Sequence, residues 1–355
     1  MQLSLLSYSL DVLTDIITCI QIQSAFDIQH SRYQPLDLPE AVIDRYRQLP
    51  EALQRRYQCQ KLRDYLYGIY FSHEQDLVVE MDVNPENAAE NARNESPLRN
   101  DSIRGINRTF YEQIQDANQG QGYFDAGWQI TELSPTHRMV QKQGLTVQID
   151  PSYHLSPRDR AAQMGEWVAI RLPKNRLENG FYVAVSNAGV PHGAGVAIYF
   201  NVNPTGAITL MQHFTQALNR RQIAFTLKLL YDPTDYGRYD AVTLYLERHH
   251  YPEIVPLLKQ IYQQTQSEFS PAVPLFTKPL ALGLGIAEAP EAEPHNFGLH
   301  RCQLVAKGLL AAWETGNETP EQRLSYIHQT FAQSQIHLQF PYLNPGSLDV
   351  YLPFD

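Results

Sequence analysis

The spacing of hydrophobic residues divides this chain into a helical first part and a mixed remainder. Up to about residue 72, apolar side chains recur one, three and four positions apart, which is the pattern of helices with one buried face. From about residue 127 the pattern changes to short alternating runs, which predict β-strands. The predicted strands are 167–172, 181–186, 196–202, 223–231 and 241–247, and the predicted helices among and after them are 205–222, 251–266, 298–315 and 319–334. Because strands and helices do not alternate strictly, we predict an α+β fold with a mixed, mainly antiparallel sheet flanked by helices.

The same pattern predicts three regions along the chain. Residues 1–75 are expected to form a helical N-terminal region, residues 76–126 a polar loop or linker, and residues 127–355 the α+β domain. The stretch 83–108 is rich in asparagine and nearly free of large apolar residues, which is typical of a long loop.

Composition narrows the classes of protein to which the chain can belong. Of its 355 residues 43% are hydrophobic, which excludes a disordered tail, and 28 basic against 38 acidic residues give a net charge of −10. An acidic protein lacks the clustered Lys and Arg that bind nucleic-acid backbones, so we predict no nucleic-acid partner. No run approaches the roughly 20 apolar residues of a membrane span, and Asp11 and Asp15 occupy the region where a signal peptide carries positive charge, so we expect a cytoplasmic protein without a membrane partner. The three cysteines are too far apart in sequence for a metal or disulfide pattern, and we expect reduced thiols.

Lys228 is the most informative candidate for chemistry. In the predicted strand 223–231 it shares a face with Thr226 and Leu230, opposite an apolar face, and its immediate neighbours Leu227 and Leu229 are apolar. Burial or nearby cations favour the neutral form of such an amine, which could then accept a proton. The alternative is a solvated strand lysine whose stem covers apolar surface.

Further cations occur in contexts unlike ordinary surface charge. Arg238 lies in a turn between two predicted strands, Lys278 lies among apolar and proline residues, and Arg301 lies near the start of a predicted helix. Helix starts and guanidinium groups both bind anions, so these residues could form a phosphate cradle in an otherwise acidic protein. Together with Arg171 of the strand 167–172 they make up the predicted phosphate-binding set. Each of them could instead be an ordinary salt-bridge partner.

Histidines offer a general acid but no metal site. His192 lies in a glycine-rich turn between strands, where its side chain could reach into a cleft as a general acid, although most turn histidines have no chemical role. Adjacent His249 and His250 would point to opposite sides of a strand, and no second ligand set has a recognisable spacing, so we predict no metal. The sequence contains no phosphate-binding P-loop, serine-hydrolase elbow or zinc-protease motif.

Read together, several segments resemble a known family. FYVAVSNAGVP, IAFTLKLLYDP, GRYDAVTLYLER, TKPLALGLGIAE and FGLHRC, in this order, look like the HopA-type effector family over roughly residues 120–340. Members of this family occur as type III secreted effectors of plant pathogens and as standalone proteins of bacterial peptide-biosynthesis clusters.

The resemblance implies a reaction. Family members in lanthipeptide and thioamitide clusters act beside a small kinase as lyases, which eliminate phosphate from phosphoserine or phosphothreonine and leave dehydroalanine or dehydrobutyrine. On this analogy Lys228 is the base, Arg238, Lys278 and Arg301 hold the phosphate, and His192 is the nominated acid. The implied partner is a phosphorylated precursor peptide, a partner kinase is also compatible with the resemblance, and no cofactor or metal is expected.

A different class of function is also compatible with the sequence. The chain could be a non-catalytic effector-like module that keeps the fold but binds a leader peptide or a partner protein. Tyr65, Tyr67 and Tyr70 cannot share one helical face, so some of them are expected to be exposed or to face a partner, which would fit such a module.

Overall fold

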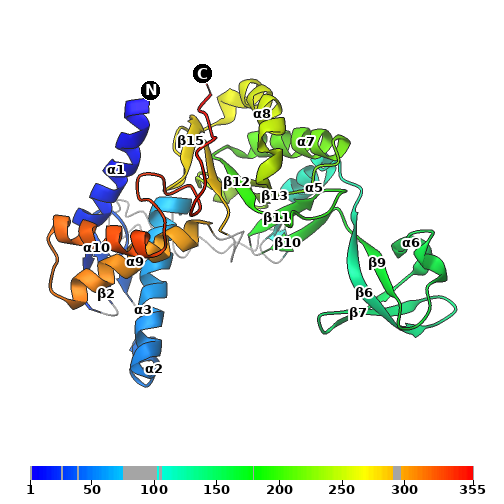
Figure 1. Cartoon of the computed structure of the whole chain (residues 1–355), viewed down its shortest axis with the longest axis horizontal. Coiled ribbons are helices and arrows are strands. Elements are labelled where there is room, and N and C mark those ends of the chain that lie inside the picture. Colours follow the sequence, from blue (N-terminus) through cyan, green and yellow to red (C-terminus); the bar gives the residue numbers. More distant parts are fainter. Residues whose placement is uncertain are drawn as a thin grey trace.

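The molecule consists of a central sheet with a helical part on one side and a small second sheet on the other (Figure 1). The computed structural model describes residues 2–24, 27–37, 40–74, 102–103, 106–178, 180–290 and 297–354. In this part of the chain all pairings between named strands are antiparallel, and helices cover both faces of the central sheet. The predicted α+β class is therefore confirmed.

The central sheet has seven strands. Their spatial order is β10 (Asn175–Glu178), β11 (Phe181–Val185), β13 (Phe225–Leu230), β14 (Val242–Glu247), β12 (Gly195–Phe200), β16 (Leu284–Glu288) and β15 (Lys278–Ala281). The four strands predicted between residues 181 and 247 are all present. The edge strand β10 and the hairpin of β15 and β16 were not predicted.

The register of this sheet aligns one polar row. Lys228 on β13 pairs with Val183 and with Thr243, and Thr243 pairs with Tyr199 on β12. Directly paired residues point to the same side of a sheet, so these side chains share one face. The opposite face carries Leu227 and Leu229 and their neighbours, as the alternation along the strand predicts.

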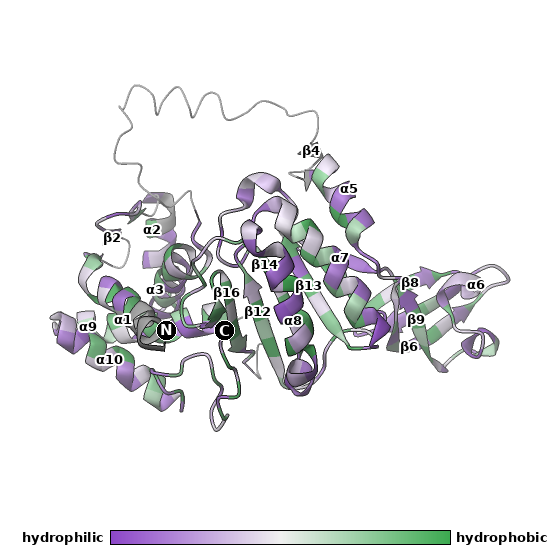
Figure 2. Cartoon of the chain, turned by 90° about the horizontal axis from the view of Figure 1, so that it is seen from above, coloured by the Kyte–Doolittle hydropathy of each residue, from purple (hydrophilic) through white to green (hydrophobic). Residues whose placement is uncertain are grey.

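Helices cover the apolar face of the central sheet (Figure 2). They are α5 (Arg108–Ala117), α7 (Pro204–Arg220) and α8 (Tyr251–Thr265). Phe214 of α7 lies 5.4 Å, ring centre to ring centre, from Phe200, and Tyr111 of α5 lies 5.6 Å from Tyr182. Burial of these aromatic pairs holds the helices against the sheet.

The polar face is only partly covered. The segment η1 (Tyr67–Ser72), which is a π-helix, and the helix α9 (Phe297–Glu314) pack against it through Phe71, whose ring centre lies 5.4 Å from that of Tyr199. Gly298 makes this close approach possible, because a Cβ there would lie 2.7 Å from the Phe71 ring. The part of this face around Lys228 is left open.

The helical part joins the two ends of the chain. Its remaining helices are α1 (Gln2–Cys19), α2 (Glu40–Arg47), α3 (Glu51–Leu66) and α10 (Pro320–Gln333). The prediction that residues 1–72 are helical is wrong between residues 20 and 37, which form the three-stranded sheet of β1 (Ile20–Ile22), β2 (Asp27–His30) and β3 (Leu36–Asp37). Ile20 and Ile22 are buried on either side of exposed Gln21, so the local period is that of a strand.

A second, separate sheet lies at the far end of the molecule (Figure 1). It consists of β8 (Leu145–Ile149), β7 (Arg138–Lys142), β6 (Tyr123–Leu133) and β9 (Trp167–Leu172), with α6 (Pro151–His154) beside it. It has its own buried cluster, which includes Trp128, Ile130 and Val168. The predicted strand 167–172 is present but belongs to this sheet.

The predicted polar loop 76–126 contains regular structure that we did not expect. The short pair β4 (Ser102–Ile103) and β5 (Ile106–Asn107) precedes α5, whose N-cap Asn107 accepts a hydrogen bond from the main-chain N–H of Phe110 at 3.0 Å. Phe110 and Ile114, four residues apart, supply the buried face of this short helix. Residues 75–101, and with them most of the stretch 83–108, lie outside the described residues.

Among the described residues, no helix combines the length and the apolar character that crossing a membrane requires.

Candidate functional site

A cavity of about 430 Å³ opens on the polar face of the central sheet. Four parts of the chain far apart in sequence surround it: the sheet itself, the β13–β14 connection, η1 and the first turn of α9. The lining residues are Tyr67, Phe71, Phe181, Tyr199, Lys228, Arg238, Asp240, Thr243, Tyr245, Gly298 and Leu299. Two of the predicted site residues, Lys228 and Arg238, therefore meet in one cavity, which is called the first cavity below.

Lys228 points from the middle of the sheet into the first cavity. Its Nζ lies 3.1 Å from Oε2 of Glu178 on the edge strand β10, which is separated from β13 by β11, and 4.1 Å from the ring centre of Phe181 on β11. Its side chain is 26% exposed. The expected apolar neighbourhood is thus present in the Phe181 ring, but β10 adds a carboxylate that sequence reasoning did not place there.

Arg238 is held rigidly at the rim. Its Nε and Nη2 donate to the two carboxylate oxygens of Asp240 at 2.9 and 3.0 Å, and Nη1 lies 3.4 Å from Oε1 of Glu74. Burial opposes the charge of the guanidinium, but the Asp240 carboxylate outweighs it and raises the pKa of Arg238. Its Cζ lies 5.5 Å from the Phe181 ring centre, so both cations contact the same ring.

The charges around the first cavity balance. Lys228, Arg238 and Arg176 face Glu178, Asp240 and Glu74, and Arg176 lies 3.3 Å from the same Glu178 carboxylate. The three acids differ in burial: Asp240 is buried, whereas the side chains of Glu178 and Glu74 are 40% and 43% exposed. An entering anion can therefore displace the two glutamates while Asp240 continues to orient Arg238. The N-terminal turn of α9 adds main-chain N–H groups and a positive dipole end to the same rim.

Tyrosine hydroxyls supply further polar groups to the first cavity. Tyr67 donates a hydrogen bond to Asp240 at 3.0 Å, and Tyr199 and Tyr245 are hydrogen-bonded to each other. Burial raises the pKa of all three phenols, so they remain protonated at neutral pH. Each phenol is therefore neutral, and the proton of Tyr67 is directed at Asp240.

Arg301 has a different surrounding. It is 1% exposed, and its Nε and Nη2 donate to the main-chain carbonyls of Pro341 and Leu343 at 2.7 and 3.0 Å. Burial lowers its pKa to about 10. These bonds hold the C-terminal segment against α9, and no donor of this side chain is directed at the first cavity among the bonds that the structure describes.

The other three predicted site residues lie farther away. Lys278 is on β15, four strand spacings or about 19 Å from β13, and forms an ion pair with Asp349. Arg171 is on β9 of the second sheet, where it donates to the main-chain carbonyl of Gln121 at 2.7 Å. The exposed His192 donates its main-chain N–H to Glu247 at 3.2 Å, and Glu247 lies four residues, about 14 Å, along β14 from the Lys228 row. The predicted set is therefore divided, and only Lys228 and Arg238 converge.

Some of the residues around Lys228 and Arg238 could be predicted from the sequence, and others could not. Thr243 and Tyr245 alternate on the strand 241–247 that pairs with the Lys228 strand, and Asp240 follows Arg238 by two residues. Tyr67 was noted in the sequence only as one of three tyrosines that cannot share a helical face, and its place at the first cavity depends on the packing of the helical part.

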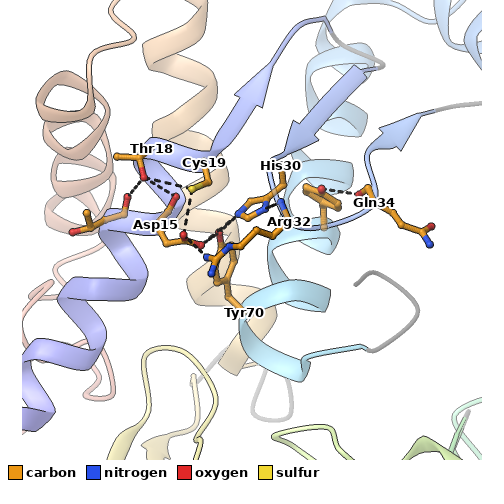
Figure 3. A network of polar contacts seen from close by, with 9 residues as sticks. Asp15, Thr18, Cys19, His30, Arg32, Gln34 and Tyr70 are labelled. Carbon is orange, nitrogen blue, oxygen red and sulfur yellow. Dashed lines mark hydrogen bonds and ion pairs between the residues drawn. The ribbon is translucent and has the colours of Figure 1, made fainter. Parts of the chain in front are cut away.

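One cluster outside the first cavity has the residue types of a metal site. Ligand atoms of Asp15, Cys19 and His30 lie within 4.8 Å of one another (Figure 3). However, Nδ1 of His30 accepts the main-chain N–H of Arg32 at 3.0 Å, so Nε2 carries the proton of the neutral ring and lies 2.8 Å from the Tyr70 hydroxyl. A protonated nitrogen is no ligand, and Arg32 already pairs with Asp15. These residues fit a hydrogen-bond network and not a metal centre.

The comparison with family models agrees with the resemblance seen in the sequence. Residues 172–343 match the HopA1 effector protein family. The match includes all seven strands of the central sheet, with Lys228 and Arg238, and excludes the helical N-terminal region. It also begins after Arg171, and the second sheet lies before it except for the last residue of β9.

Two solved structures are similar to this chain. One is the effector protein from Pseudomonas syringae pv. tomato strain DC3000, with 15% identity and a TM-score of 0.43 over 80% of this chain and 90% of that one. The other is the effector protein from Pseudomonas syringae pv. syringae strain 61, with 16% identity and a TM-score of 0.43 over 81% and 96%. No curated protein matches the sequence.

Proposed function

We propose that the first cavity binds a phosphoserine or phosphothreonine residue of a peptide and eliminates its phosphate. The observation that carries this proposal is the convergence of Lys228 and Arg238 on Phe181, in a cavity that protonated tyrosines also line. The family match over the same residues supports it. The substrate would be a precursor peptide phosphorylated by a partner kinase.

The reaction breaks three bonds, which are Cα–H, Cβ–O and the O–H of a proton donor, and it forms an N–H bond on Lys228, the Cα=Cβ double bond and an O–H bond on the released phosphate. Nζ of Lys228 removes the Cα proton, the electron pair of the C–H bond forms the Cα=Cβ double bond, and the Cβ–O bond breaks toward the phosphate. The products are a dehydroamino acid and inorganic phosphate. Lys228 must lose its proton and leave its ion pair with the Glu178 carboxylate, at 3.1 Å, before it can act as the base.

The leaving group determines the other roles. A phosphate ester carries close to two negative charges, which a fixed guanidinium can stabilise as charge builds on the leaving oxygen. Arg238 fits this role because Asp240 orients it. Protonation of the leaving oxygen falls to the tyrosine hydroxyls, in place of His192, which lies outside the first cavity.

Mass spectrometry of phosphopeptides tests the proposal. Wild-type protein should convert a phosphoserine peptide into a product that has lost phosphoric acid and carries an alkene. Lys228→Ala should abolish this conversion. Lys278→Ala is a matched control, because Lys278 is also a strand lysine in an ion pair and lies 5.3 Å from a ring centre, that of Tyr342. A product that carries a hydroxyl would mean hydrolysis and would refute the lyase, and equal rates for wild type and Lys228→Ala would refute the base.

A non-catalytic peptide-binding module is the second candidate. The observation in its favour is that the carboxylates of Glu178, Asp240 and Glu74 already neutralise the cations around the first cavity. Such a module would bind peptides with or without phosphate and release them unchanged. Binding without any product in the experiment above would support it.

A further inference from the structure

A second cavity of about 280 Å³ lies behind the wall of the first. Alternate residues of the same two segments line one cavity or the other. Arg238 and Asp240 line the first cavity, while Tyr239 between them lines the second. Along η1, Tyr67 and Phe71 likewise line the first cavity, and Ile69 and Tyr70 line the second.

The second cavity combines carboxylates with aromatic rings. Asp11 and Asp15 of α1 line it, and Asp15 is paired with Arg32, also in the lining (Figure 3). Asp11 has no ion-pair or hydrogen-bond partner in the part of the chain that the structure describes, so one negative charge at the rim is not compensated. Tyr33 and Tyr70, which lie 6.4 Å apart between ring centres, contribute ring faces and edges.

His73 and Tyr239 form a fixed flat wall in the second cavity. Their rings stack with centres 4.5 Å apart at an angle of 5°. His73 ends η1 in the left-handed conformation, with φ of 58°, and its ring is hydrogen-bonded to the main chain of Ile69. Burial lowers the pKa of His73, so at neutral pH the wall is an uncharged aromatic surface and not a cation.

We propose that the second cavity binds a lysine or arginine side chain of the same peptide whose phosphorylated residue enters the first cavity. A carboxylate without a partner beside tyrosine rings is complementary to an ammonium or guanidinium group, through charge and through cation–π contact. The inference rests on the proposed function in one respect only, which is that the ligand of both cavities is one peptide.

The shared wall sets the spacing between the two peptide residues. Consecutive Cα atoms such as those of Arg238 and Tyr239 are about 3.8 Å apart, so a single layer of main chain with its side chains separates the two cavities. An extended peptide advances about 3.4 Å per residue. The basic residue should therefore lie about two to four residues from the phosphorylated one.

Fluorescence anisotropy with four peptides tests this site. The peptides carry serine or phosphoserine, each with lysine or glutamine three residues away. We expect wild-type protein to bind each lysine peptide about five- to tenfold more tightly than its glutamine partner. Asp11→Asn should bring this ratio close to one. Asp44→Asn, an exposed carboxylate on α2, controls for the net negative charge of the protein and should leave the ratio unchanged.

The outcomes separate this inference from the lyase proposal. A lysine preference that Asp11→Asn removes, without any elimination product, would support the second cavity and refute the lyase. Equal binding of the lysine and glutamine peptides, or a preference that persists in Asp11→Asn, would overturn the second cavity whatever the elimination assay gives.

Discussion

The carboxylate of Glu178 lies 3.1 Å from Nζ of Lys228, so the proposed base on β13 is ion-paired with a residue of the edge strand β10. The same carboxylate contacts Arg176 on β10. Glu178 therefore occupies the position from which an anionic ligand would approach Lys228 and Arg176.

Removing this carboxylate should strengthen anion binding. We expect Glu178→Gln to raise the affinity for inorganic phosphate about two- to fivefold, because phosphate no longer competes with a partly exposed ion pair. Titration calorimetry measures the change. Glu112→Gln removes a comparable carboxylate, 2.9 Å from Arg108 on α5, and serves as the control. An unchanged affinity in Glu178→Gln would mean that phosphate does not bind at Lys228.

Arg301 should prove to be a structural residue. A lysine at this position keeps the charge but cannot reach the carbonyls of Pro341 and Leu343 together, so at least one buried acceptor loses its donor. We expect Arg301→Lys to lower the free energy of unfolding by about 2 kcal/mol, measured in urea. Phosphate affinity of the folded variant should stay at the wild-type value, and a large loss of that affinity would return Arg301 to the anion site.

His30 should make the fold less stable in mild acid. Burial is the main cause that lowers its pKa, against the opposing charge of Asp15, while an unfolded chain titrates near 6.5. Below about pH 6.5 the unfolded chain therefore binds a proton that the folded chain does not. The free energy of unfolding keeps its full value above this pH and falls as the pH drops toward the folded-state pKa of His30. The half-buried His73, whose pKa burial also lowers, contributes with the same sign.

Thermal unfolding at several pH values checks this expectation. The fall in Tm between about pH 7.5 and pH 5.5 should be smaller in His30→Gln than in wild type. His328→Gln, at an exposed position of α10, should show the wild-type fall. Asp15 does not titrate in this pH range. Burial alone would raise the pKa of its carboxyl, but hydrogen bonds from Tyr70 and Cys19 and the charge of Arg32 lower it below its ordinary value near 3.8. Identical slopes in wild type and His30→Gln would contradict the assignment.

The sequence by itself determined the α+β class, most strands of the central sheet and the face of β13 that carries Lys228. These features follow from period-2 and period-3.6 patterns, which local chain geometry fixes before any long-range contact forms. The family resemblance rested on the same residues, and the match over 172–343 confirms it.

Only the tertiary structure decided which cations share a cavity. Arg238 lies near Lys228 because the connection between two paired strands returns to the same sheet. Arg301 instead donates hydrogen bonds to main-chain carbonyls of the C-terminal segment, and Lys278 forms an ion pair with a carboxylate of that segment. Glu178, Tyr67 and the second cavity come from an edge strand and from η1, whose positions depend on packing between residues far apart in sequence. Local patterns carry no information about such contacts. They therefore predicted which face of the strand carries Lys228, but not which residues contact Lys228 there.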